Sequence, residues 1–187
     1  FGYNIRNLAN WTLITMSSEL RVDRILPVDG APTSGGGSII QVVSDTKTDT
    51  QTIQSQSFTT ISGLSVTITP KFSTSKILIM YSISVGCNNY GMFNLRRAGT
   101  EIFRGDAASN RIRCTFESGV MNQYEMQICS GTFLDSPSST SALTYDFQCA
   151  TPDSSSSQVF INRYKTDNDA NYVGRATSVI TAMEVSA

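Results

Sequence analysis

Arginine is concentrated in one stretch of the sequence. Of the ten arginines, five lie within eighteen residues: Arg96, Arg97, Arg104, Arg111 and Arg113. A guanidinium group presents a planar fork that matches carboxylate, sulfate or phosphate oxygens, so this cluster could form a surface that contacts an anion or a glycan. Such residues also commonly lie on a solvated strand face or pair with carboxylates of the same or a neighbouring subunit. We favour the interpretation that these arginines are solvated or paired with carboxylates. The nearby acidic residues that could pair with them are Glu101, Asp106 and Glu117.

Two loops carry tyrosines that could stack on sugar rings. Tyr90 lies at the tip of the predicted loop 88–91, and Tyr172 follows the polar run 167–171. A tyrosine ring offers an apolar face and a polar tip, although in loops it more often packs at a protein interface. The surface that we predict for glycan contact comprises these two tyrosines and three of the arginines: Tyr90, Arg96, Arg104, Arg111 and Tyr172.

Candidate metal ligands are few. The run 167–171 offers side-chain oxygens at alternate positions, as a calcium loop does, but it lacks the glycine at the sixth position and the distant glutamate of such loops. We interpret it as a polar turn before the last strand. The four cysteines show no CxxC spacing and the sequence contains no histidine. We therefore predict no metal site and no cofactor.

The cysteines lie in or beside apolar segments, at Cys87, Cys114, Cys129 and Cys149. Buried free thiols are the favoured interpretation, because a free cysteine behaves as a small apolar residue. Free thiols would fit assembly in a reducing cytoplasm. Disulfides in any of the three possible pairings stay open at this point.

The composition argues against several functional classes. Without histidine the sequence lacks the commonest general base and the usual Ser-His-Asp triad. A pair of carboxylates can cleave glycans, but such enzymes need a long groove that a small sandwich seldom supplies. We therefore predict no enzymatic activity and no catalytic residues. The net charge of −1 disfavours a nucleic-acid binder, and the sequence has no run of about 18 apolar residues that would predict membrane insertion.

Branched and aromatic residues indicate strands. Isoleucine and valine together outnumber leucine by 27 to 9, and serine and threonine make up 47 of the 187 residues. Such side chains suit a pleated, half-buried surface. No helical pattern of ten residues follows Gly37, so folds that alternate strands with helices are excluded. The sequence therefore predicts an all-β fold, an antiparallel β-sandwich (jelly roll) with an extended N-terminal arm.

Alternation of apolar and polar residues locates the strands. Residues 76–86 give the clearest pattern, because five apolar side chains from Ile77 to Val85 share one face. Residues 92–97 place Phe93 and Leu95 inward and turn back through 98–100 into a hairpin with 101–104. The phenylalanines of these strands could fill the core of a single subunit. The other expected strands are 39–44, 65–69, 123–128, 142–149, 159–161 and 177–185.

The segment before these strands reads as an attachment arm. Residues 1–33 include apolar side chains at a two-residue period that cannot form a core of their own, and residues 34–38 form a Gly/Ser-rich hinge. Residues 39–187 make up the predicted jelly-roll domain. We expect the arm to dock on a larger assembly through five apolar residues: Leu20, Val22, Ile25, Leu26 and Val28.

Four blocks of the sequence resemble tail-fibre-like proteins of tailed bacteriophages, in particular phages of cyanobacteria and marine bacteria. They are 18–30 (SELRVDRILPVDG), 40–49 (IQVVSDTKTD), 91–113 (GMFNLRRAGTEIFRGDAASNRIR) and Ser178–Val185 (SVITAMEV). The resemblance covers residues 18–185, and residues 1–15 depart from it. It implies a jelly roll similar to complement and tumour-necrosis-factor domains, assembled as a homotrimer on the virion.

Three functions follow as expectations. The first is a structural virion protein, assembled in the bacterial cytoplasm, whose arm docks on the tail or baseplate and whose distal loops contact a host surface glycan. The second is a capsid decoration (cement) protein that binds the major capsid protein and stabilises the head. The third is a secreted bacterial adhesive module of complement-like fold. Whether the protein lies on the head or on the tail of the particle separates the first two.

Overall fold

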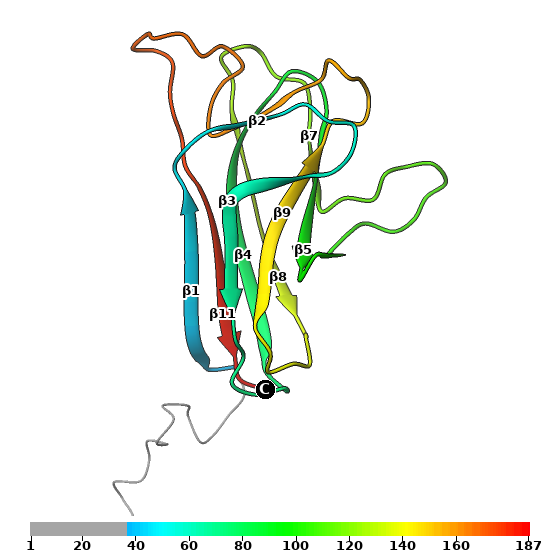
Figure 1. The fold of residues 1–187 in the computed structure, drawn as a ribbon, viewed down its shortest axis with the longest axis vertical. Helices are drawn as coiled ribbons and strands as arrows, with labels where there is room; N and C mark the ends of the chain where they lie inside the picture. The colour runs from blue at the N-terminus through cyan, green and yellow to red at the C-terminus, as the bar shows by residue number, and fades with distance from the viewer. Residues whose placement is uncertain (1–36) are drawn as a thin grey trace, which may run out of the picture.

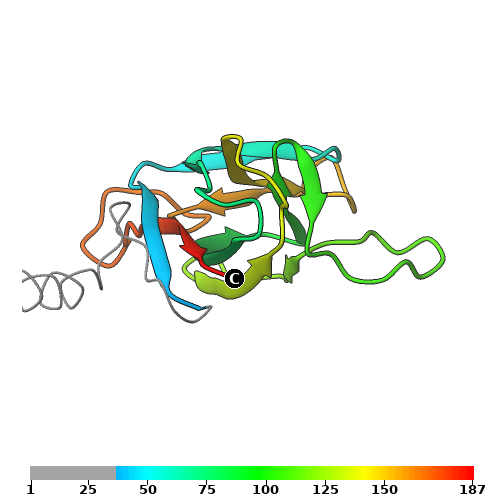
Figure 2. The same cartoon turned by 90° about the horizontal axis from the view of Figure 1, so that it is seen from below.

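The computed structural model describes residues 37–187, and in that part of the chain there are strands, turns and loops but no helix (Figure 1). Two antiparallel sheets pack face to face (Figure 2), so the predicted all-β sandwich is confirmed. Eleven strands follow one another in this part of the chain: β1 (Ile39–Lys47), β2 (Gln51–Ile53), β3 (Thr59–Ile68), β4 (Lys76–Cys87), β5 (Gly91–Arg97), β6 (Thr100–Ile102), β7 (Phe116–Ser118), β8 (Gln127–Asp135), β9 (Leu143–Ala150), β10 (Val159–Ile161) and β11 (Ser178–Val185).

Strands that are distant in the sequence lie side by side in both sheets. Sheet A has the order β1-β11-β4-β10-β2, with β8 on the edge of β4 opposite β11. Sheet B has the order β3-β9-β5-β6, and β7 also pairs with β5. From β3 to β10 most connections cross from one sheet to the other, which is the chain path of a jelly roll.

The core lies between the sheets and follows the predicted alternation. On β4, the predicted inward face is buried, and Ile77, Ile79 and Ile83 have no exposed surface. On β9, every second side chain from Leu143 to Cys149 is buried. The predicted inward residues of β5, Phe93 and Leu95, are buried as well. Two-residue periodicity therefore located the core correctly along these three strands.

Aromatic rings fill the centre of this core. Phe116 stacks on Phe93 with 4.5 Å between ring centroids, and Tyr81 contacts Phe116 at 5.7 Å and Phe147 at 4.8 Å. Phe160 of β10 is buried outside this cluster, with the Arg163 guanidinium 4.5 Å from its ring centroid. The phenylalanines therefore pack inside a single subunit, as one of the sequence interpretations allowed.

A buried polar contact joins the two sheets. Asp135, at the end of β8 in sheet A, accepts hydrogen bonds from Arg97 and Tyr145 in sheet B. Arg97 reaches both carboxylate oxygens at 2.8 Å, and the Tyr145 hydroxyl lies 2.7 Å from Oδ2. Burial and the neighbouring Asp135 carboxylate raise the pKa of Tyr145 strongly, so its hydroxyl stays protonated and donates.

The predicted hairpin is present and has the expected turn. Arg97 pairs with Thr100 across a two-residue connection, and both connecting residues adopt a positive φ, 47° at Ala98 and 79° at Gly99. Such a turn matches the right-handed twist of the flanking strands. The second strand of the hairpin, β6, ends at Ile102, two residues earlier than predicted.

One predicted strand, 123–128, is wrong. A turn occupies its first half, because Asn122 and Glu125 hydrogen-bond each other through backbone and side chains. β8 begins only at Gln127 and has the opposite facing, so that Ile128 is 70% exposed while Cys129 packs against the core. The apolar residues at even positions therefore suggested an inward strand face that the fold does not have. The sequence also gave no indication of the short strands β2 and β7.

The sandwich has two distinct ends. Gly37 and the C-terminal residues lie at one end, where the Gly37 N–H donates to the Ser186 carbonyl at 2.7 Å. The opposite end carries the loops that we call the distal loops, residues 88–90, 119–126, 151–158 and 162–177 (Figure 1). The predicted arm, with Leu20, Val22, Ile25, Leu26 and Val28, lies outside the described residues, as does the predicted hinge except for Gly37 and Ser38.

Gly131 occupies a strand position without room for a side chain. It pairs with Tyr81, and a Cβ atom at this position would lie 2.5 Å from the Tyr81 hydroxyl oxygen. The Tyr81 ring is fixed by Phe116 and Phe147, so we expect Gly131→Ala to lower the free energy of unfolding by about 1–3 kcal/mol in denaturant titrations. The control is Gly119→Ala, where the new Cβ meets no atom within 4 Å. Equal stability of the two variants would contradict the prediction.

Glu184 of β11 is a buried carboxylate held by hydrogen bonds at the Gly37 end. The Gln41 side-chain amide lies 2.6 Å from Oε2, and the backbone N–H of Lys71 lies 2.8 Å from Oε1. Burial alone would raise the pKa of Glu184. The hydrogen bonds from Gln41 and from the backbone of Lys71 and Phe72 outweigh that effect and lower the pKa below its ordinary value of 4.5.

This shift makes stability depend on pH in a defined direction. Because the pKa of Glu184 is lower in the folded chain, its carboxylate stabilises the fold above pH 4.5, and the contribution is lost as the pH falls below that value. We expect Glu184→Gln to lower the free energy of unfolding by about 1–3 kcal/mol at pH 7. The difference in free energy of unfolding between the variant and the parent protein should become smaller as the pH falls below 4.5. If this difference in free energy of unfolding were unchanged well below pH 4.5, the charge of the Glu184 carboxylate would not contribute to stability.

Candidate functional site

The middle of the outer side of sheet A is a surface without charge. We call it the uncharged face; it consists of the following outward side chains of four adjacent strands, none of them ionisable: Val42, Ser44 and Thr46 of β1, Val179, Thr181 and Met183 of β11, Leu78, Met80 and Ser82 of β4, and Ile128, Ser130, Thr132 and Leu134 of β8. Lys76, the first residue of β4, is exposed at its edge. Four side chains of the uncharged face are large, apolar and exposed: Val42, Met80, Ile128 and Leu134. Contiguous apolar surface of this kind usually marks an interaction site.

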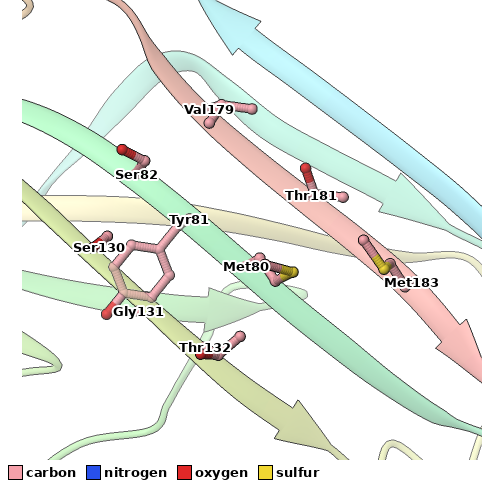
Figure 3. A pocket seen from close by; sticks show the side chains of 9 residues that line it. All are labelled: Met80, Tyr81, Ser82, Ser130, Gly131, Thr132, Val179, Thr181 and Met183. Carbon is pink, nitrogen blue, oxygen red and sulfur yellow. The ribbon is translucent and has the colours of Figure 1, made fainter.

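A hollow of about 410 Å³ lies in the middle of this face. Figure 3 shows Met80 and Met183 next to each other on neighbouring strands, with Thr181 and Val179 along the same side. The ring of Tyr81 crosses toward Gly131 and closes the floor. Methionine side chains are flexible and polarisable, so such a hollow adapts to an apolar side chain of a partner.

A long loop projects sideways from the edge of sheet B. It connects β6 to β7, which both pair with β5, and we call residues 103–115 the projecting loop (Figure 2). Every residue from Gly105 to Arg113 is exposed. Its base is closed by the Gly105 N–H, which donates to the Cys114 carbonyl at 3.2 Å. At the root of the loop, the exposed ring of Phe103 stacks on Phe133 of β8 with 4.6 Å between centroids.

Most of the clustered arginines have partners within the subunit. Arg96 binds both oxygens of Asp146 on the outer side of sheet B, Arg97 binds Asp135, and Arg104 pairs with Glu101, one of the acids proposed from the sequence. Arg113 donates to the Gly105 carbonyl at 2.6 Å. The side chain of Arg111, in the projecting loop, has no hydrogen-bond or ion-pair partner among the described residues, and its backbone N–H donates to the Ala108 carbonyl at 3.1 Å. The pairing interpretation therefore holds for Arg96, Arg97 and Arg104.

The five predicted contact residues do not form one site. Tyr90 and Tyr172 lie in distal loops, whereas Arg96 and Arg104 lie on and beside sheet B and Arg111 lies in the projecting loop. No hydrogen bond, ion pair or ring contact in the described part of the chain joins any two of them. Because the arginines are close in the sequence, we predicted that they share one surface. In the fold they lie on different parts of the protein.

The structure instead pairs Tyr172 with a tyrosine that the sequence analysis assigned to a strand. Tyr124 lies in the distal loop 119–126, and its ring meets that of Tyr172 edge-on, with centroids 5.7 Å apart and an interplanar angle of 78°. The rings are 42% and 63% exposed, respectively. The turn-forming pair Asn122 and Glu125 was the sequence signal that could have placed Tyr124 in a loop.

A second hollow, of about 380 Å³, lies in the loop that carries Tyr172. Its lining is polar, with Asp167, Asn168, Asp169 and Arg175 as the chemical groups. Arg175 binds Asp167 at 2.6 Å, and Arg163 approaches the same carboxylate at 3.8 Å. Asp167 is therefore an ion-pair partner within this polar turn, and residues 37–187 hold no group of three acidic, cysteine or histidine side chains that could bind a metal.

The four cysteines have free thiols. Cys87 and Cys149 are buried in the core, and Cys114 and Cys129 are half-buried. Burial raises the pKa of each thiol, most strongly for Cys149. The thiolate is the reactive form, so these groups are poor nucleophiles at neutral pH and act as small packing residues.

Comparison with known proteins supplies no relative. A scan of the chain against models of protein families and a search among curated proteins both find no match. Among residues 37–187 there is no helix with the length and apolar character needed to cross a membrane. The surfaces that could carry a function are therefore the uncharged face, the projecting loop and the distal loops.

Proposed function

We propose that this protein is a structural virion protein of a tailed bacteriophage, a tail-fibre-like homotrimer that docks by its N-terminal arm and contacts the host surface through its distal loops. The observation that carries the proposal is the uncharged face, which a lone subunit would leave in water. The resemblance of residues 18–185 to tail-fibre-like proteins supports the virion location. The placement of the distal loops opposite Gly37 supports the division between an attachment end and a contact end.

A second copy of the chain is the occupant that best suits the uncharged face. Covering exposed Met80 and Ile128 is favourable at about 25 cal/mol per Å² of apolar surface, and no charge has to be stripped of water on this face. The serines and threonines between the apolar residues can exchange water for hydrogen bonds across an interface. The net charge of −1 gives only weak repulsion between copies.

The apolar surfaces of one subunit favour a head-to-tail arrangement. The root of the projecting loop presents the exposed ring of Phe103, and this surface is different from the uncharged face. When two different surfaces of one protein bind each other, copies associate head to tail, and a suitable rotation closes them into a ring. In our proposal the Phe103 side of one subunit covers the uncharged face of the next, and three copies close the ring.

The arm would complete the assembly. Its apolar residues Leu20, Val22, Ile25, Leu26 and Val28 are the proposed contacts with a tail or baseplate protein. A trimer gives three such arms, and linked binding sites reinforce each other through their effective concentration. A capsid decoration protein would use the same trimer on the head, so the position on the particle distinguishes the two roles.

A charge in the uncharged face should abolish assembly. We expect the parent protein to sediment as a trimer at micromolar concentration, and Met80→Glu to raise the concentration needed for assembly about 100-fold or more, because an unpaired charge would be buried. Thr144→Glu is the matched control, because Thr144 is an exposed strand residue on the outer side of sheet B. A monomeric parent protein, or a trimer of Met80→Glu, would contradict the proposed interface.

Location on the particle tests the virion role independently. An antibody against residues 37–187 should label the tails of intact particles in electron micrographs. Labelling of the heads would replace the tail-fibre proposal with the capsid decoration role. Absence of the protein from purified particles would overturn both.

A further inference from the structure

The tyrosine pair of the distal loops is an exposed aromatic surface with unused binding capacity. In the edge-on contact of Tyr124 and Tyr172, the edge of one ring lies against one face of the other. The remaining faces of the two rings are therefore open to a ligand. Neither hydroxyl has a hydrogen-bond partner among the described residues. Aromatic side chains that are exposed on loops, apolar on the face and polar at the tip suit ligands that combine both characters.

Hydrogen bonds between two separate loops hold this pair in place. The Thr166 N–H donates to the Gln123 carbonyl at 3.0 Å, which joins the loop that carries Tyr172 to the loop that carries Tyr124. The Val173 N–H donates to the Ala170 carbonyl at 3.0 Å, which forms a turn around Tyr172. A surface that is already ordered loses less conformational entropy when a ligand binds.

The polar hollow of about 380 Å³ lies in the same loop as Tyr172, with lining residues on both sides of it in the sequence. This volume falls within the range of small-molecule sites, about 300–1,000 Å³. The side chains of Asn168 and Asp169 have no hydrogen-bond partner in the described part of the chain. The carboxylate of Asp169 can accept two hydroxyl donors, and the amide of Asn168 can both donate and accept.

The charges of the hollow select among ligands. Arg175 and Arg163 both bind Asp167, so the carboxylate of Asp169 stays without a cationic partner. An anionic ligand would meet this carboxylate, whereas a neutral polyhydroxyl ligand would hydrogen-bond to it. A pyranose ring has C–H groups that pack on an aromatic face and hydroxyls around its rim. Its ring faces suit the tyrosine pair, and its hydroxyls suit the polar groups of the hollow.

We propose that the distal loops 119–126 and 162–177 bind a neutral pyranose, with Tyr172 and Tyr124 against the sugar ring and Asn168 and Asp169 on its hydroxyls. This inference rests on the proposed function, because it names the class of host-surface ligand that the distal loops contact. A single small site of this kind binds weakly, and three sites in one trimer strengthen attachment to a surface that displays many sugars.

Titration of the full chain with simple sugars tests the site. The probes are the methyl glycosides of glucose, galactose, mannose and N-acetylglucosamine, followed by NMR of the labelled protein, with the methyl glycoside of N-acetylneuraminic acid as the anionic comparison. We expect at least one neutral glycoside to shift resonances of the two distal loops, and the anionic sugar to bind more weakly. The absence of binding by all four neutral sugars would overturn the proposal, as would stronger binding of the anionic one.

Variants separate the tyrosine site from other exposed rings. Tyr172→Ala should weaken sugar binding at least tenfold without lowering thermal stability, because this side chain is largely exposed. Phe72→Ala is the control, since Phe72 is a partly exposed aromatic residue at the Gly37 end, away from the distal loops, and this variant should bind as the parent protein does. Undiminished binding by Tyr172→Ala would refute the assignment. If the protein binds sugar but the antibody labels no virion, the sugar site is supported and the proposed function is overturned. If the antibody labels the tails but no sugar binds, the proposed function is supported and the sugar site is overturned.

Discussion

The apolar layer shared by the two sheets determines which side of every strand faces outward. Ile79 and Ile83 of β4 pack without exposed surface against aromatic residues of sheet B, including Phe147. Successive side chains of a strand point to opposite faces, so Met80 must lie outside once these neighbours lie inside. A slip of one residue would expose the isoleucines. The apolar side chains of the uncharged face are therefore not required by the core, and in our proposal assembly with other copies covers them.

Buried polar contacts hold both ends of the sandwich. Asp135 joins the sheets and Glu184 holds the backbone at Lys71, both at the end where the described chain enters through Gly37. Hydrogen bonds to a buried charge are stronger than neutral ones, and their loss leaves a desolvated group without a partner. At the opposite end, the buried side-chain amide of Asn162 donates to the carbonyls of Lys47 and Asp49, and its oxygen accepts from the Ser178 hydroxyl. Both ends are thus fixed from inside the sandwich, and the exposed parts of the distal loops are left to carry the proposed ligand-binding groups.

Local patterns in the sequence predict this fold where alternation is uninterrupted, as in β4 and β9, because one buried face requires that pattern. They fail at Tyr124, where apolar residues at even positions imitate a strand and the Asn122–Glu125 turn overrides it. They also cannot pair Arg96 with Asp146, since strand order brings these residues together across fifty positions. The sequence indicated Tyr172 as a sugar contact, but its pairing with Tyr124 was missed for the same reason. The two tyrosines come from loops whose contact depends on the tertiary fold.

The proposed interface and the proposed sugar site depend on each other through geometry. The strands of sheet A run from the Gly37 end to the distal end, so the uncharged face extends along the side of the sandwich and leaves both ends open (Figure 1). Copies joined along their sides around an axis parallel to the strands would direct all their distal loops the same way, and all their arms the opposite way. Each shallow sugar site would then act on one host surface together with its symmetry mates, where individually weak contacts combine. In this arrangement the uncharged face contributes to attachment without touching the host.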